Sequence, residues 1–244
     1  MIKLEHTEVV GWEHAIRGAR NPMNSWDKMD SVINDWIEVD VTDEEGVPRK
    51  DTVRIHSLDI GPNDLDLMKR LCKAGTDHRK FMRMIVVYVD ITAPLYWWKE
   101  FDTYKVGTVA NSCSTMHKIH AKEFEWDDFS YEHLIRVRDC KLGEPVPTLA
   151  METTINALNH WRGRYLTALK TEDETGLSAK DIWWQMIQLL PTSYNQKRTV
   201  MLNYEVLANI YKARKNHKLD EWHVLCEWIE SLSYSELITG KKEK

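Results

Sequence analysis

Apolar and polar side chains alternate in two short segments of the first quarter of the chain. Residues 36–41 alternate cleanly, which is the period of a half-buried strand, and residues 53–56 repeat the pattern. The intervening residues 42–50 are polar and include Gly46 and Pro48, which are typical of a turn. The pattern therefore predicts a β-hairpin.

A helix and a buried strand are predicted next. Gly61 and Pro62 precede Asn63 and Asp64, either of which is placed to cap a helix that runs to about residue 74. Residues 84–91 form a short run rich in β-branched side chains, which suits a strand buried on both faces.

The second half of the chain is mostly helical in pattern. Residues 95–117 begin with aromatic residues and become polar and small, which indicates a helix followed by a loop, and we expect the functional site there. Residues 139–147 contain Gly143, Pro145 and Pro147 and resemble a linker. After this stretch we expect helices over 149–170, 178–189, 200–215 and 219–231.

Strands in the first part of the chain and helices in the later part predict an α+β fold, with an antiparallel or mixed sheet packed against a largely helical C-terminal half. We expect residues 1–244 to form one domain, with an internal boundary near 139–148 as the alternative.

Composition narrows the classes of function. The net charge of −5 disfavours a nucleic-acid-binding protein, because such binding relies on excess Lys and Arg. The four cysteines are widely separated without metal-binding spacing, which favours reduced thiols. The first residues lack an apolar signal core, and no apolar run approaches the length of a membrane span. We therefore expect a cytoplasmic protein without membrane or nucleic-acid partners.

Two segments carry candidate chemistry. Residues 111–117 contain Asn111, Ser112, Cys113 and Ser114 in a row, and their hydroxyls and backbone amides suit either phosphate oxygens or a turn with a helix cap. Cys113 has no neighbour in sequence that would activate it as a nucleophile.

The second segment is a predicted helical face that ends in an arginine. Asn203, Leu207, Ile210 and Arg214 are spaced four, three and four residues apart and share one side of the helix. Burying a guanidinium without a partner is costly, so Arg214 should meet either a ligand or a structural carboxylate. The carboxylates considered for this ion pair are Glu100 and Asp220. We expect the other basic residues around this helix end to be solvated: Lys212, Lys215, His217 and Lys218. No set of histidines has the spacing of a metal site.

The order of these segments resembles the flavin-dependent thymidylate synthases. In that family a strand ends in proline, an aromatic stretch leads to an Arg-His-Arg triplet, and Asn-Glu-x-Ser-x-Arg-Tyr follows. Here Pro94 is followed at the matching interval by residues 103–105, Thr-Tyr-Lys, and then by Asn111 and Ser114. Later in the chain, Leu190 and Pro191 precede a helix that carries the family's remaining positions: Asn203, Glu205, Asn209 and Arg214. The resemblance spans roughly residues 65–225.

The resemblance implies a thymidylate synthase-complementing-protein-like fold and the reductive methylation of dUMP to dTMP. In the family FAD delivers the hydride, NADPH and methylenetetrahydrofolate are co-substrates, and homotetramers share sites between subunits. It assigns Arg214 as the catalytic residue, which contacts the pyrimidine ring. The other substrate-binding residues would be Glu100, Ser112, Cys113 and Ser114. The FAD-binding residues would be Thr103, Tyr104, Lys105, Asn111, Asn203 and Asn209, and no metal site is implied.

Several departures from the family pattern leave three functions open. The flavin-binding triplet retains a single cation, Lys105, and the arginine of Asn-x-Arg is Glu205. The family's glutamine is Glu100, and the Glu and Arg of the second motif are Ser112 and Met116. We therefore expect FAD to bind more weakly than in the family. The alternatives to a thymidylate synthase are an enzyme that modifies another pyrimidine nucleotide and a catalytically silent nucleotide-binding homologue.

Overall fold

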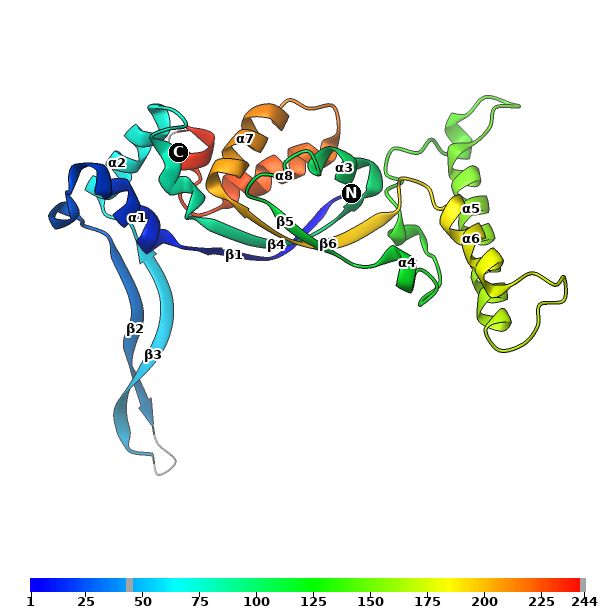
Figure 1. Cartoon of the computed structure of the whole chain (residues 1–244), viewed down its shortest axis with the longest axis horizontal. Helices are drawn as coiled ribbons and strands as arrows, with labels where there is room; N and C mark the ends of the chain where they lie inside the picture. Colours follow the sequence, from blue (N-terminus) through cyan, green and yellow to red (C-terminus); the bar gives the residue numbers. More distant parts are fainter. Residues whose placement is uncertain (43–45, 242–244) are drawn as a thin grey trace.

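A four-stranded antiparallel sheet runs through the centre of the molecule (Figure 1). The computed structural model describes residues 1–42 and 46–241, with the backbone alone at 34–37 and 53–57. Its strand order is β1-β4-β6-β5. The bounds of these strands are β1 Lys3–Val10, β4 Val86–Pro94, β6 Asn195–Asn203 and β5 Val109–Ser112. The predicted α+β fold with an antiparallel sheet and a largely helical C-terminal half is confirmed.

Helices cover one face of this sheet. α3 (Leu95–Phe101), α7 (Tyr204–Arg214) and α8 (Asp220–Ser231) lie above the sheet in Figure 1. β4 turns Val87 and Val89 into the core beneath these helices, whereas Tyr88 on the other face is 40% exposed. The prediction that this strand is buried on both faces is therefore wrong, because helices cover the sheet on one side.

Helices also gather at both ends of the sheet. α1 (Trp12–Arg20), α2 (Pro62–Lys73) and α9 (Glu236–Thr239) lie at one end, and α5 (Pro147–Ala168) and α6 (Ala179–Leu189) at the other (Figure 1). A second buried cluster sits between the latter pair and the segment before them, formed by Ile119, Phe124, Phe129, Ile155, Leu158 and Met186. The remaining elements are α4 (Thr115–Lys118) and short 3-10 helices: η1 Asn21–Met23, η2 Trp26–Lys28, η3 Arg79–Arg83, η4 Trp126–Asp128 and η5 Val137–Asp139. No helix in the described ranges is both long and apolar enough to cross a membrane.

The predicted hairpin is confirmed and projects away from the body of the molecule (Figure 1). Its strands are β2 (Val32–Thr42) and β3 (Pro48–Asp59), paired antiparallel from Val32 opposite Asp59 to Thr42 opposite Pro48. Part of the expected turn, residues 43–45, lies outside the described residues.

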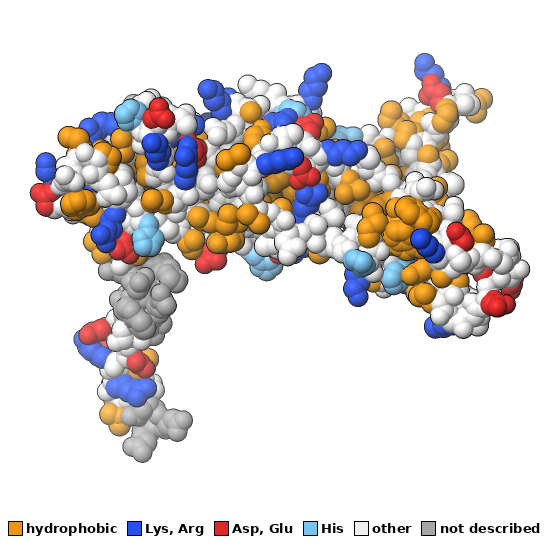
Figure 2. Space-filling model, viewed as in Figure 1, with side chains coloured by type: hydrophobic (Ala, Val, Ile, Leu, Met, Phe, Trp, Pro, Cys, Tyr) orange, Lys and Arg blue, Asp and Glu red, His pale blue; other side chains and the backbone are white. Residues whose placement is uncertain are grey.

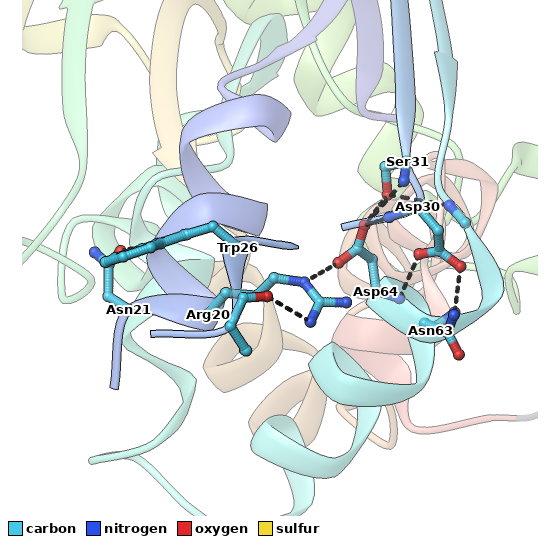
Figure 3. Close-up of polar contacts among 9 residues, drawn as sticks. Arg20, Asn21, Trp26, Asp30, Ser31, Asn63 and Asp64 are labelled. Carbon is cyan, nitrogen blue, oxygen red and sulfur yellow. Dashed lines mark hydrogen bonds and ion pairs between the residues drawn. The ribbon is translucent and has the colours of Figure 1, made fainter. Parts of the chain in front are cut away.

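A buried carboxylate fixes the base of this hairpin (Figure 3). Asp64 is fully buried and accepts Arg20 Nε at 2.5 Å, the Ser31 hydroxyl at 2.6 Å and the backbone N–H groups of Asp30 and Ser31 at 3.0 Å. In return, Asp30 accepts the backbone N–H groups of Asn63 and Asp64 at 2.9 and 3.0 Å. The expectation that Asn63 or Asp64 caps the helix is wrong: Gly61 is the N-cap residue, and Asp30 satisfies the first N–H groups of α2 from the adjacent loop.

Ionisation of Asp64 depends on these bonds. Burial favours the neutral carboxyl, but the bonds from Ser31 and Arg20 outweigh burial and hold the pKa of Asp64 below its ordinary value. A lowered folded-state pKa means that this carboxylate stabilises the fold at neutral pH and that its contribution is lost as the pH falls through the lowered pKa.

Three strands were not predicted: β1, β5 and β6. β6 includes residues 200–203, which the sequence pattern placed in a helix that in fact begins at Tyr204. The segment 109–112, expected to be a loop, forms β5 at the edge of the sheet, and all four of its residues are exposed. In β6 the polar residues Gln196 and Arg198 share the face of the buried Val200 and Leu202, and β5 has no buried residue, so neither segment shows a clean alternation of apolar and polar side chains.

Replacing Asp64 with Asn should destabilise the protein by about 2–4 kcal/mol, because Arg20 would remain buried without a carboxylate. Urea denaturation measures this change in the free energy of unfolding. Asp66→Asn is the matched control, since Asp66 is 68% exposed and, among the described residues, pairs with Arg70 alone on its own helix, so roughly 0.5 kcal/mol or less is expected. Equal effects of the two substitutions would contradict the anchoring role of Asp64.

Candidate functional site

Glu100, at the C-terminal end of α3, meets three side-chain nitrogens at one oxygen. Its Oε2 atom accepts Arg214 Nη1 at 2.7 Å and Trp222 Nε1 at 3.0 Å, and lies 3.3 Å from His217 Nε2. Arg214 also donates from Nε to the Tyr104 hydroxyl at 2.9 Å. These five side chains form the glutamate-arginine cluster, which joins α3 to the end of α7 and the start of α8.

The helical face predicted on α7 places Arg214 in this cluster. Leu207 and Ile210 are fully buried, and Arg214 follows them on the same side with 18% of its side chain exposed. Its guanidinium carbon lies 4.6 Å from the centre of the Trp222 ring, a cation–π contact. The inward orientation of Arg214 is confirmed, and of the two carboxylates considered as partners, Glu100 is the one that pairs with it.

Two members of the cluster were missed in the sequence. His217 was assigned to a solvated basic face, but its side chain is 24% exposed and faces Glu100. Trp222 lies two residues past Asp220 in α8, which was correctly predicted as a helix. The five-residue connection between α7 and α8, residues 215–219, brings both side chains back to Glu100, and no local pattern signals such a reversal.

The loop after α3 brings the three-residue segment 103–105 toward α7. Thr103 donates to the backbone oxygen of Glu100 at 2.7 Å, Tyr104 bonds Arg214, and Lys105 is exposed. Gly107 follows with φ +76°, and a Cβ atom added there would lie 2.8 Å from Asn203 Nδ2. Only glycine therefore leaves space beside the Asn203 amide at this point.

The two asparagines of α7 are both engaged through their oxygens. Asn203 is the N-cap of the helix and accepts the N–H of Val206 at 3.0 Å. Asn209 is exposed and accepts Arg79 Nη2 at 3.0 Å. Their Nδ2 groups have no hydrogen-bond partner within residues 1–42 and 46–241, so both amides can donate to a ligand.

Glu205 is held between two arginines of η3. It is 7% exposed, forms a hydrogen-bonded ion pair with Arg83, and lies 3.4 Å from Arg79 Nε. The bond from Glu205 raises the pKa of Arg83. The two arginines and one carboxylate leave a net positive charge next to Asn209, although position 205 itself is acidic.

The residues that were expected to bind the nucleotide phosphate are not part of the glutamate-arginine cluster. Ser112, Cys113 and Ser114 line a cavity of about 400 Å³ together with Gln196, whose amide donates to the Cys113 oxygen at 3.1 Å. Ser114 caps the one-turn helix α4 by accepting the N–H of His117 at 3.2 Å. The capping role considered for this serine is confirmed, and its hydroxyl hydrogen remains available to a ligand. Asn111 lies in β5 opposite Thr199.

Within one chain these two groups are not joined. The glutamate-arginine cluster lies at the C-terminal end of α3, on the side of the sheet that α7 and α8 cover, whereas α4 and Ser114 lie below the sheet (Figure 1). Across the described part of the chain, no hydrogen bond or ion pair connects Arg214 with 112–114. The same part of the chain holds no group of three or more His, Cys, Asp and Glu side chains that could bind a metal ion.

The fold has close counterparts among solved structures. Thymidylate synthase X from Helicobacter pylori, in a crystal structure with FAD and dUMP, aligns over 98% of this chain and 97% of its own, with a TM-score of 0.59 and 14% identity. The chain has a ThyX-like fold. No model of a known protein family matches the sequence, and no curated protein matches it significantly.

A second ThyX-like structure extends the comparison. A UMP/dUMP methylase from Streptomyces cacaoi, PolB, bound with 5-bromo-dUMP, aligns over 98% of this chain and 92% of its own, with a TM-score of 0.53 and 12% identity. The same enzyme bound with 5-bromo-UMP gives a TM-score of 0.53 and 13% identity.

Proposed function

We propose that this chain is a flavin-dependent pyrimidine nucleotide methylase, and that it converts dUMP to dTMP. The observation that supports this most is the position of Arg214 in a ThyX-like fold. Its guanidinium is oriented by Glu100 and Tyr104, and these two bonds use two of its five N–H groups. The remaining donors can reach a planar ligand that carries carbonyl groups.

Arg214 would stabilise negative charge that develops on the uracil ring. A guanidinium that is already fixed by a carboxylate and a hydroxyl loses little side-chain freedom when it binds. Its charge acts most strongly where water is excluded, and the contact with the Trp222 ring shields one face. Glu100 and Tyr104 would therefore position the arginine, and Arg214 would contact the substrate.

The phosphate of the nucleotide would bind at Ser112, Cys113 and Ser114. All three are exposed and line the cavity of about 400 Å³, which is within the size range of small-molecule sites. The Ser112 and Ser114 hydroxyls would donate hydrogen bonds to phosphate oxygens.

A complete site would require two copies of the chain, because no hydrogen bond or ion pair joins Arg214 to residues 112–114 within the described part of the chain. The uncovered side of the sheet supports this arrangement, since Tyr88 and Val109 are 40% and 60% exposed there. Hydrophobic side chains also lie on the underside of the sheet in Figure 2. Exposed apolar patches of this kind mark association surfaces. We therefore propose a homo-oligomer whose sites combine both groups, a tetramer by resemblance.

The residues present also fit FAD, although with a different set of cations. The space that Gly107 leaves beside the Asn203 amide would admit the ligand close to the backbone, and Asn209 would donate from its amide. Arg79 and Arg83 would supply positive charge near the position where the family carries an arginine and this chain carries Glu205. When bound, FAD supplies the reducing chemistry, with NADPH and methylenetetrahydrofolate as co-substrates by resemblance.

UMP is the second candidate substrate. The similarity to PolB, a UMP/dUMP methylase, favours an enzyme that also accepts the ribonucleotide. Parallel assays with UMP and dUMP separate the two candidates.

Arg214→Ala should lower dUMP affinity at least about tenfold and reduce turnover to background, since a charge-assisted contact to the ring is lost. Calorimetry measures the affinity, and release of tritium from labelled dUMP measures turnover. Lys218→Ala is the control, because Lys218 is an exposed cation four residues further on that bonds nothing in the described chain. Unchanged dUMP affinity and turnover in Arg214→Ala would refute the assignment.

The purified protein should lose FAD on gel filtration and regain a flavin spectrum when FAD is added. This follows from the reduced number of cations at 103–105 and the acidic Glu205. Absorbance between 350 and 500 nm, roughly the range of flavin absorption, reports bound cofactor independently of turnover. Stoichiometric FAD that survives gel filtration would contradict weak binding, and no binding at saturating FAD would contradict a flavoenzyme.

Sites shared between copies predict complementation between two inactive variants. Arg214→Ala and Ser114→Ala, co-expressed with different tags and purified through both, should recover activity because about one site in two of a mixed dimer would be intact. Each variant paired with itself is the control. If mixed oligomers form and stay inactive, Arg214 and Ser114 do not share a site.

A further inference from the structure

A second cavity, of about 450 Å³, lies between α2, α7 and α9. From α7 it is lined by Ala208, Tyr211 and Lys212, and by Lys215 just beyond the helix end. These positions are about a third of a turn round the helix from the face that carries Arg214. The cavity is therefore separate from the glutamate-arginine cluster, and it borders the proposed FAD site, with which it shares Arg79.

The lining of this cavity is strongly cationic, although the chain has a net charge of −5. Six of the described lining residues are Lys or Arg, and one, Glu236, is a carboxylate; the cations are Lys69, Lys73, Arg79, Lys212, Lys215 and Lys241. In Figure 2, Lys and Arg side chains gather over the region that holds α2 and the C-terminal segment.

Half of these cations are already neutralised. Lys69 Nζ lies 3.2 Å from Glu236, Arg79 Nε lies 3.4 Å from Glu205, and Lys241 Nζ lies 2.6 Å from Glu230. The other three have no carboxylate within ion-pairing distance among residues 1–42 and 46–241: Lys73, Lys212 and Lys215.

The helix dipoles do not balance the three remaining charges. Lys73 is in the last turn of α2, and Lys212 and Lys215 lie at the end of α7, where cations are stabilised by the helix dipole. Each helix C-terminus carries roughly half a negative charge, so two ends offset about one of three charges. Lys212 and Lys215 are also three residues apart on one helix, a spacing at which like charges repel. An anion between them would relieve this repulsion.

Below the cations the cavity has an apolar floor. Ala208, Tyr211, Leu237 and Ile238 all line it, and each is less than a tenth exposed. Positive charge at the rim and apolar surface at the base suit a ligand with an anionic group joined to an apolar or aromatic body.

We propose that this cavity binds a phosphorylated small molecule, with Lys73, Lys212 and Lys215 on the phosphate and the α7–α9 floor against the rest of the ligand. Binding would be saturable and would weaken as ionic strength rises, because exposed lysines are screened by salt. A phosphate without an organic body would bind less tightly, since it would not contact Tyr211 or Leu237.

Calorimetry with ADP, pyrophosphate and adenosine tests this proposal. All titrations use the Arg214→Ala variant of the full chain, which removes the pyrimidine nucleotide site and leaves the second cavity intact. ADP should bind most tightly, pyrophosphate more weakly and adenosine least. Adding Lys212→Gln and Lys215→Gln should weaken ADP binding roughly tenfold for each lysine removed. Lys170→Gln with Lys180→Gln is the matched control, because both are exposed lysines far from this cavity in sequence, Lys170 just after α5 and Lys180 in the first turn of α6, and the change in net charge is the same.

The outcomes separate this cavity from the proposed function. Loss of ADP binding in the Lys212/Lys215 variant, with binding retained in the Lys170/Lys180 control, supports the cavity whatever the result with dUMP. Equal loss in both variants shows a general effect of charge and overturns the proposal. Absence of saturable binding by ADP and pyrophosphate also overturns it, as does ADP binding that is unchanged without Lys212 and Lys215.

Discussion

One carboxylate oxygen holds the candidate site together. Oε2 of Glu100 is the point at which the end of α3, the end of α7 and the start of α8 meet, through Arg214, Trp222 and His217. A carboxylate accepts several donors at once, and these bonds fix both the direction and the plane of the guanidinium. The arginine is thereby a structural ion pair and an oriented donor at the same time. An inward arginine can pair with a carboxylate or bind a ligand, and here it can do both. Two of its N–H groups bond Tyr104 and Glu100, and the other N–H groups remain free to bind a ligand.

The environment of Glu205 shows how an acidic residue can lie in a positively charged region of the fold. A carboxylate that is 7% exposed would be costly alone, and Arg79 and Arg83 of η3 compensate it. The positive charge next to Asn209 thus comes from a segment more than one hundred residues earlier in the chain. A sequence motif shows the acidic residue at position 205 but not the arginines of η3 that surround it, because these residues meet only in the folded protein.

The sequence revealed the elements whose pattern reflects local burial. The α7 stripe of Leu207 and Ile210, the hairpin and the helix after Gly61 follow from periodicity and turn residues. β6 was missed at residues 200–203 because the first half of the strand, residues 195–198, is polar on both faces of the sheet. The cap at Asp30 and the participation of His217 in the site depend on loops that meet in space, and no spacing along the chain encodes them. The order of the motifs predicted the fold, but the contacts that each side chain makes could be identified only in the three-dimensional structure.

Helix α7 carries both candidate sites, and its packing decides whether they communicate. Leu207 and Ile210 are fully buried, and Tyr204 at its first turn is buried against Trp12, so the helix is fixed along its inner side. Coupling between two sites requires an element with two arrangements that each ligand stabilises differently. A helix that is held by a close-packed core has a single arrangement. Arg214 is tied to Glu100, whereas Lys212 and Lys215 are exposed side chains that adjust without moving the backbone. The geometry therefore argues for two energetically independent sites on one rigid helix, rather than for an allosteric pair.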